Sequence, residues 1–166
     1  EEPGYVGSYV MELAERARLN RPELSEAEEL GKFGMDEMMK EIWVTCDEMG
    51  VYFESRVSEK DILENYTPRI LEKLEEKGVT VRKEGAVWLA TNDQFLEDRE
   101  CVLVRSDGRP TYFANDIAYH VEKYKKGYDR IINIWGSNHH GHIPRMKASL
   151  QALGYDPAKL ETVLYQ

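Results

Sequence analysis

Residues 131–153 read IINIWGSNHHGHIPRMKASLQAL and contain the pattern that decides the fold. The first five, Ile131-Ile132-Asn133-Ile134-Trp135, form a nearly continuous apolar run, as expected for a strand whose sheet is covered on both faces. A turn of small and polar residues, 136–142, follows this strand. Apolar residues at helical spacing then predict a helix from about Gly141 to Leu153. The stretch therefore predicts a strand, a turn and a helix of an α/β layer.

The segments on either side continue this alternation. Before it, the sequence predicts a strand at 101–104, a turn at 106–110 and a helix from about 114 to 126. After it, residues 161–165 predict a last strand. Strand, helix, strand, helix and strand at this spacing predict a parallel sheet in an α/β layer.

The first hundred residues are predicted to be mostly helical. A short helix is expected at about 9–17, and a second one carries the methionine-rich stripe Met35, Met38, Met39, Ile42, Cys46 and Met49. We interpret this stripe as ordinary core, with a soft binding surface as the alternative. Residues 51–53 predict a strand.

A third helix is expected from Ser58 to Gly78. Ser58 is a candidate N-cap, and Pro68 should kink or split the helix because proline lacks the backbone N–H. Residues 79–81 and 86–89 flank Lys83-Glu84-Gly85 and predict a hairpin. The polar stretch 91–100 predicts a loop.

The composition is that of a folded domain. The 166 residues are 42% hydrophobic and 32% charged, which argues against disorder. No apolar run reaches the ~18 residues of a membrane span, and the start has no signal-peptide pattern, so we expect a cytoplasmic protein without membrane contact. The net charge of −9 argues against a nonspecific nucleic-acid binder. We expect Cys46 and Cys101 to be buried free thiols.

The first candidate site is the entry to the helix near residue 114. Tyr112 and Asp116 are four residues apart, so they share a face if both are helical. A phenol beside a carboxylate can bind a cation. The alternative is structural: Asp116 would be a first-turn carboxylate favoured by the helix dipole, with Tyr112 in the core.

The second candidate site is the turn 136–142, because ligands of open parallel sheets bind beyond the carboxyl ends of the strands. Its three histidines suggest a metal, but the adjacent His139 and His140 point apart in regular structure and no second ligand cluster exists. We therefore predict no metal site. No G-x-G-x-x-G or Walker lysine motif is present, so dinucleotide and P-loop sites lack support.

Two stretches carry a resemblance to a known family. The run 102–120, VLVRSDGRPTYFANDIAYH, and the run 129–141, DRIINIWGSNHHG, closely resemble bacterial arginyl-tRNA synthetases. Ile143-Pro144-Arg145, residues 152–156 and residues 163–166 continue the resemblance, and residues 5–9 and 33–36 match more loosely.

The resemblance implies a Rossmann-like class I synthetase that activates arginine with ATP and transfers it to tRNA(Arg). The expected fold is α/β, a partial Rossmann-like parallel sheet with a helical and β-hairpin insertion subdomain. Residues 1–100 would be the connective insertion, and residues 101–166 the start of the second half of the catalytic domain. Tyr112 and Asp116 would contact arginine, with Asp116 paired to its guanidinium. Asn138 and His139 would lie near substrate and adenylate, although relatives carry an acid and an aromatic near this turn where this chain has Asn138 and His142.

The resemblance also implies missing parts. The H-x-G-H signature that holds ATP is absent, and so is the later lysine-containing loop. We therefore expect an internal fragment of the catalytic region that is inactive alone, with no assigned catalytic residue and no tightly bound cofactor. ATP with Mg would be a substrate of the parent enzyme. The alternatives are a stand-alone amino-acid-binding module and a nucleotide- or metal-dependent α/β protein built on the histidine turn.

Overall fold

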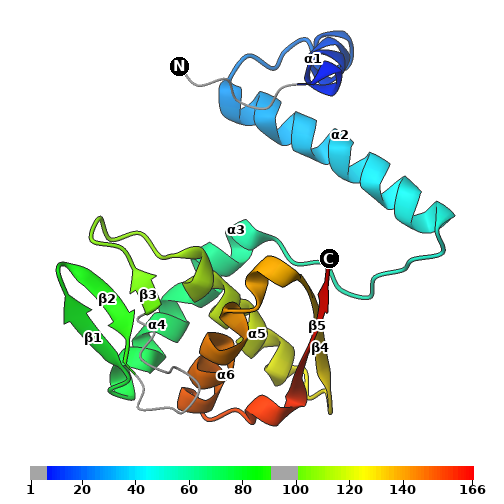
Figure 1. The fold of residues 1–166 in the computed structure, drawn as a ribbon. Helices are drawn as coiled ribbons and strands as arrows, with labels where there is room; N and C mark the ends of the chain where they lie inside the picture. The colour runs from blue at the N-terminus through cyan, green and yellow to red at the C-terminus, as the bar shows by residue number, and fades with distance from the viewer. Residues whose placement is uncertain (1–6, 91–100) are drawn as a thin grey trace. The chain divides into compact units, whose positions relative to one another are not determined.

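The computed structural model describes residues 7–90 and 101–166 (Figure 1). The loop expected at 91–100 lies outside these residues. The chain divides into two compact units, residues 1–56 and residues 57–166, which we call the N-terminal and C-terminal units.

The N-terminal unit is built from two helices, α1 (Ser8–Asn20) and α2 (Ala27–Glu48). Both expected helices are confirmed, although α2 begins well before the predicted stripe. The core interpretation of the stripe is wrong. No residue of α2 is buried, and Met35, Ile42 and Met49 are 58%, 46% and 72% exposed. The physical reason is that the described part of this unit contains no third layer to cover that side of α2. Cys46 is correspondingly only partly buried.

Residues 51–53 form no strand, contrary to the prediction. Phe53 instead lies edge-on to Trp43, with ring centroids 5.6 Å apart, and the Arg56 guanidinium lies 3.6 Å from the centre of the Trp43 ring. Residues 51–53 pair with no strand among the described residues, and Phe53 packs through its side chain instead.

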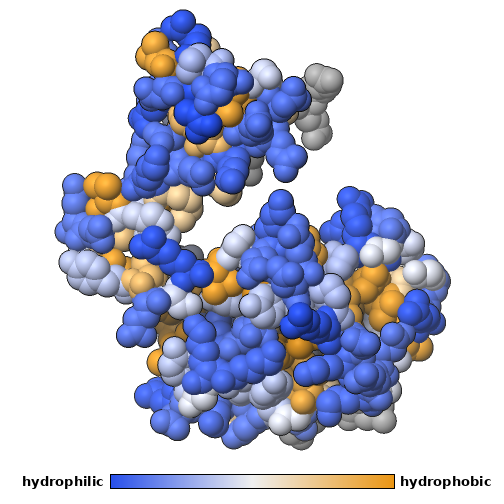
Figure 2. Space-filling model, turned by 180° about the vertical axis from the view of Figure 1, so that it is seen from behind, coloured by the Kyte–Doolittle hydropathy of each residue, from blue (hydrophilic) through white to orange (hydrophobic). Residues whose placement is uncertain are grey.

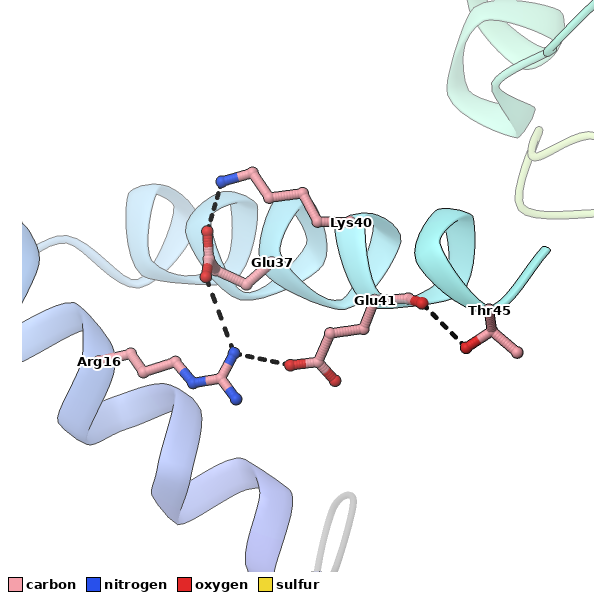
Figure 3. Close-up of polar contacts among 5 residues, drawn as sticks. All are labelled: Arg16, Glu37, Lys40, Glu41 and Thr45. Carbon is pink, nitrogen blue, oxygen red and sulfur yellow. Dashed lines mark hydrogen bonds and ion pairs between the residues drawn. The ribbon is translucent and has the colours of Figure 1, made fainter. Parts of the chain in front are cut away.

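Polar contacts between α1 and α2 lie at the surface (Figure 3). The Arg16 guanidinium donates to Glu41 at 2.6 Å and lies 3.8 Å from Glu37, which also pairs with Lys40. Exposed pairs of this kind contribute little net stability, because water competes for both charges.

The C-terminal unit begins with a helix that is interrupted. It runs through α3 (Glu59–Asp61), the π-helical turn η1 (Ile62–Tyr66) and α4 (Thr67–Glu76). The interruption predicted at Pro68 is confirmed, because the π-turn ends at Tyr66 and Pro68 lies in the first turn of α4, where its missing N–H is tolerated. Ser58 is the N-cap of α3 as predicted, but its side chain makes no capping hydrogen bond, so that part of the prediction is wrong.

A three-stranded antiparallel sheet follows. Strands β1 (Thr80–Lys83) and β2 (Ala86–Leu89) form the predicted hairpin. Its two turn residues, Glu84 and Gly85, have φ of 53° and 77°, the left-handed pair that a tight hairpin requires. Strand β3 (Cys101–Val104) joins the sheet antiparallel to β2.

The second sheet is parallel. It consists of β4 (Ile131–Gly136) and β5 (Leu160–Tyr165), with Ile131 opposite Leu160. The predicted α/β class with a parallel sheet is confirmed. The expectation that residues 101–104 belong to this sheet is wrong, because β3 pairs with the hairpin. A four-residue strand carries too little pattern to specify its partner, and the free edge of β2 provides one.

Helices α5 (Tyr112–Lys125) and α6 (His142–Ala152) complete the core, with the short 3₁₀ turns η2 (Ser137–His139) and η3 (Pro157–Lys159) beside β4 and β5. Helix α5 contacts α4, α6 and β3. The fully buried side chains include Leu74, Leu103, Ile117, Met146, Leu150 and Leu160.

One face of the parallel sheet is left uncovered by the described residues of the C-terminal unit. Ile131 and Asn133 are buried, whereas the alternate residues Ile132 and Ile134 are 53% and 69% exposed. The prediction that both faces are covered is therefore wrong for the described part of the C-terminal unit. The surface seen in Figure 2 is otherwise mostly hydrophilic, with hydrophobic residues in separate patches.

Candidate functional site

The start of α5 is fixed by Thr111, its N-cap. The Thr111 hydroxyl accepts from the Ala114 backbone N–H at 3.3 Å and lies 2.9 Å from the Val102 carbonyl oxygen, to which it donates. The Thr111 backbone N–H also donates to the Leu103 carbonyl at 2.9 Å. These bonds tie the first turn of α5 to β3, so the backbone that carries the side chains of that turn is held in place.

One face of α5 lines a cavity of about 190 Å³. This face carries Tyr112, Asn115, Asp116 and Tyr119, which lie at helical spacing i, i+3, i+4 and i+7. Val57, Glu59 and Ile62 line the cavity from the segment around α3. The structure thus brings the predicted Tyr112 and Asp116 together at one hollow.

The cavity lining has an acidic character. Asp116 and Glu59 are both carboxylates, and none of the residues that line the cavity is basic. Burial raises the pKa of the Tyr112 phenol, and the nearby Asp116 and Glu59 charges raise it further. Tyr112 therefore stays a neutral phenol beside two carboxylates, an arrangement that favours a cation over an anion.

The structural alternative for Asp116 does not fit the helix. Helix α5 begins at Tyr112, two residues earlier than predicted, and its first turn contains no acidic residue. Asp116 lies in the second turn, beyond the reach of a helix N-terminus. Tyr112 is 60% exposed, so it is not a core residue either.

Asp116 contacts a chain of polar groups, of which His120 and Asn133 are buried. The His120 Nδ1 lies 2.7 Å from the Asp116 carbonyl oxygen and 3.4 Å from its carboxylate Oδ1. Because a carbonyl can only accept, Nδ1 carries the proton and donates. The free Nε2 then accepts from the Asn133 amide at 2.5 Å, and the Asn133 oxygen accepts from the Lys123 ammonium at 3.0 Å. Helix α5 and strand β4 are thereby joined behind the carboxylate.

Burial lowers the pKa of Lys123, and the Asp116 charge opposes that shift. The Lys123 ammonium also lies 4.2 Å from the centre of the Tyr119 ring. The Lys123 ammonium therefore interacts with the Asn133 side-chain oxygen and with the Tyr119 ring.

The turn after β4 forms a separate aromatic group. Asn138 folds back over Gly136, where an added Cβ would lie 2.7 Å from the Asn138 Oδ1, so any larger residue there would displace the Asn138 side chain. The His139 ring lies 6.2 Å from Trp135 and 5.3 Å from His142, and His142 lies 5.9 Å from Phe113. Burial, with His139 and Arg145 nearby, lowers the pKa of His142, so that it is neutral at pH 7. Asn138 and His139 do not line the cavity beside α5.

Among residues 7–90 and 101–166, no group of three or more His, Cys, Asp or Glu side chains could hold a metal ion. No helix in this described part of the chain combines the length and the hydropathy needed to cross a membrane.

Sequence reasoning missed five residues of the cavity, and three of them carry polar groups. Asn115 and Tyr119 share the face of Tyr112 and Asp116, so extending that spacing to i+3 and i+7 would have found them. The sequence places Glu59 only within the helix predicted from Ser58 to Gly78. No local signal reveals it, because its place beside α5 depends on the tertiary fold.

A model of a known family matches residues 12–165, and its description is "tRNA synthetases class I (R), catalytic domain". The chain therefore belongs to the class I arginyl-tRNA synthetase family. It is 44% identical to an arginine–tRNA ligase of Desulfitobacterium hafniense over 82% of this chain and 24% of the relative. An arginine–tRNA ligase of Carboxydothermus hydrogenoformans is 39% identical over 99% of this chain and 31% of the relative.

Solved structures agree. The crystal structure described as a putative arginyl-tRNA synthetase from Campylobacter jejuni matches with a TM-score of 0.87 and 36% identity, over 100% of this chain and 37% of that one. The fold is also that of the Thermus thermophilus arginyl-tRNA synthetase, with a TM-score of 0.67 at 20% identity, over 93% of this chain and 34% of that one. The chain spans 24% and 31% of the length of the two curated relatives.

Proposed function

We propose that this chain supplies the arginine side-chain pocket of a longer arginine–tRNA ligase. The observation that carries the proposal is the cavity beside α5, where Tyr112 and Asp116 meet Glu59 and no lining residue is basic. A guanidinium offers only donors, in a planar fork that suits a carboxylate. Asp116 would pair with it, and the neutral Tyr112 phenol would contact it with its oxygen or its ring.

The parent enzyme would activate L-arginine with ATP, taken as its Mg complex, and transfer it to tRNA(Arg). The relatives with these activities in their names are several times longer than this chain. The exposed apolar face of the parallel sheet supports the same proposal. Ile132, Ile134 and Val163 are all more than half exposed, whereas parallel sheets are normally covered on both faces. Other parts of the parent would cover them.

We assign the segments of the parent accordingly. Residues 1–100 would form the connective insertion, and residues 101–166 would begin the second half of the catalytic domain, although the compact units within this chain divide at residue 56. Asn138 and His139 would approach the substrate and adenylate, because their turn follows the carboxyl end of β4. An enzyme that charges tRNA works where translation occurs, which supports a cytoplasmic location.

The isolated chain would form no arginyl-adenylate. Adenylate formation requires groups positioned around the ATP phosphates. The described part of the cavity is acidic and offers no cation for this purpose. Arginine binding and adenylate formation are therefore separate properties, and the first is assigned to this segment.

The test is Asp116→Asn in the parent enzyme. This change keeps the shape and removes the charge, so the arginine KM should rise by roughly 30- to 5,000-fold, the cost of leaving a partly buried cation unpaired. The KM for ATP should stay within about twofold, because the change at Asp116 removes no contact to ATP. Asp129→Asn makes the same change at an exposed position and is the matched control. An unchanged arginine KM with a lowered melting temperature would remove Asp116 from the site.

A further inference from the structure

A second polar contact beside the cavity involves Thr67, at the junction of η1 and α4. Thr67 is completely buried. Its hydroxyl oxygen lies 2.9 Å from the Asn115 side-chain oxygen and 3.1 Å from the Ile62 carbonyl oxygen. Asn115 lines the cavity next to Asp116. The hydroxyl therefore fixes how the Asn115 amide is turned.

The number of hydrogen atoms decides this orientation. A hydroxyl has one hydrogen, so it cannot give each of two oxygens a full hydrogen bond. The Ile62 carbonyl can only accept, whereas an asparagine amide has an NH₂ end as well as an oxygen end, and hydrogen bonds tell the two apart. With the NH₂ end toward Thr67, Asn115 donates to the hydroxyl and the hydroxyl donates to Ile62. In this orientation the Asn115–Thr67 contact and the Thr67–Ile62 contact are each a normal hydrogen bond. Neither contact then brings two oxygens together without a hydrogen between them.

We infer that Asn115 presents its amide oxygen to the cavity as a third acceptor for the substrate guanidinium, beside Asp116 and Glu59. This inference rests on the proposed function. A guanidinium carries five N–H donors, and one carboxylate takes only two of them in a paired fork. A neutral oxygen held in place by Thr67 satisfies a further donor without adding charge. Asn115 is thus a residue that determines specificity for a planar, multi-donor cation.

The experiment uses the parent enzyme and arginine-dependent ATP–pyrophosphate exchange. Asn115→Leu, similar in size but without polar atoms, should raise the arginine KM by roughly 10- to 150-fold, the value of a hydrogen bond to a charged group. The kcat should change little, since the contact is made equally before and during the reaction. Asn115→Ala is the second variant if leucine disturbs folding. Asn65→Leu, at an exposed position on η1, is the matched control and should leave the KM unchanged.

Thr67 supplies an independent readout. Thr67→Val keeps the shape and removes the hydroxyl, so Asn115 loses its fixed orientation and the arginine KM should rise severalfold. Thr67→Ser keeps the hydroxyl and should restore the wild-type value. The double variant Thr67→Val with Asn115→Leu should be no worse for arginine than Asn115→Leu alone, because both changes remove one interaction.

The outcomes are distinguishable. If Asp116→Asn raises the arginine KM while Asn115→Leu and Asn115→Ala leave it unchanged or lower it, the amide does not present its oxygen and this inference is wrong, with the proposed function intact. If neither the Asp116 nor the Asn115 variants change the arginine KM, the proposed function fails and this inference fails with it.

Discussion

The two units of the chain are both rich in helix but differ in how they use it. In the described part of the N-terminal unit, Ala17 is the only buried residue, and the polar contacts of Arg16 lie at the surface. In the C-terminal unit, α5 is buried along one side and carries a cavity along another. The difference teaches that helical spacing in a sequence is enough to predict a helix. A binding site also requires other helices or strands to pack against that helix and hold its side chains in place.

The largest expected contrast is in core truncation. Leu150→Ala in the C-terminal unit should lower the free energy of unfolding by about 2–5 kcal/mol, because the side chain is completely buried. Met35→Ala in α2, where the side chain is 58% exposed, should cost less than about 1 kcal/mol. Urea denaturation followed by circular dichroism measures both. Equal losses would show that α2 is packed as tightly as the C-terminal core.

The next contrast is between buried and exposed polar groups. His120→Leu should cost about 1–3 kcal/mol, since it leaves the buried Asn133 amide without its acceptor. Arg16→Ala removes exposed pairs and should give no measurable change. The same denaturation experiment compares them. A harmless His120→Leu would mean that the polar chain behind Asp116 does not contribute to stability.

The smallest contrast changes no stability and concerns the two thiols. Burial raises the pKa of Cys101 to about 11, so roughly one molecule in a thousand carries the thiolate at pH 8. Cys46 is only partly buried. Iodoacetamide at pH 8 should therefore alkylate Cys46 well before Cys101, as read by peptide mass spectrometry. Alkylation of both at one rate would show that β3 opens readily.

Local pattern was sufficient for the elements with strong periodicity or distinctive turns. The hairpin around Glu84-Gly85, the break at Pro68 and the strand–turn–helix of 131–153 were all predictable, because each depends on neighbours in the sequence. The pairing of β3 with β2, and the exposure of Ile132, were not, since they depend on which distant segments lie alongside.

The candidate site divides in the same way. Tyr112 and Asp116 could be paired from their spacing on one helix, and the family resemblance suggested their role. Glu59 enters the cavity from a segment more than fifty residues away, so only the fold could reveal it. The histidine turn is a third case. Its composition predicts a ligand site, and that role stays a prediction, whereas the packing of His139 beside Trp135 and of His142 beside Phe113 could be found only from the structure.

The central claim is that the cavity beside α5 recognises the positive charge of arginine through Asp116. Citrulline has nearly the same shape as arginine but is neutral at the side-chain terminus. Competition in ATP–pyrophosphate exchange gives the affinities of both ligands for the parent enzyme and for its Asp116→Asn variant. The preference for arginine over citrulline should fall by roughly 30-fold or more in the variant, with citrulline affinity nearly unchanged. If both ligands lose affinity by the same factor, Asp116 maintains the fold of the pocket and does not recognise the charge of the substrate. That result would contradict the claim.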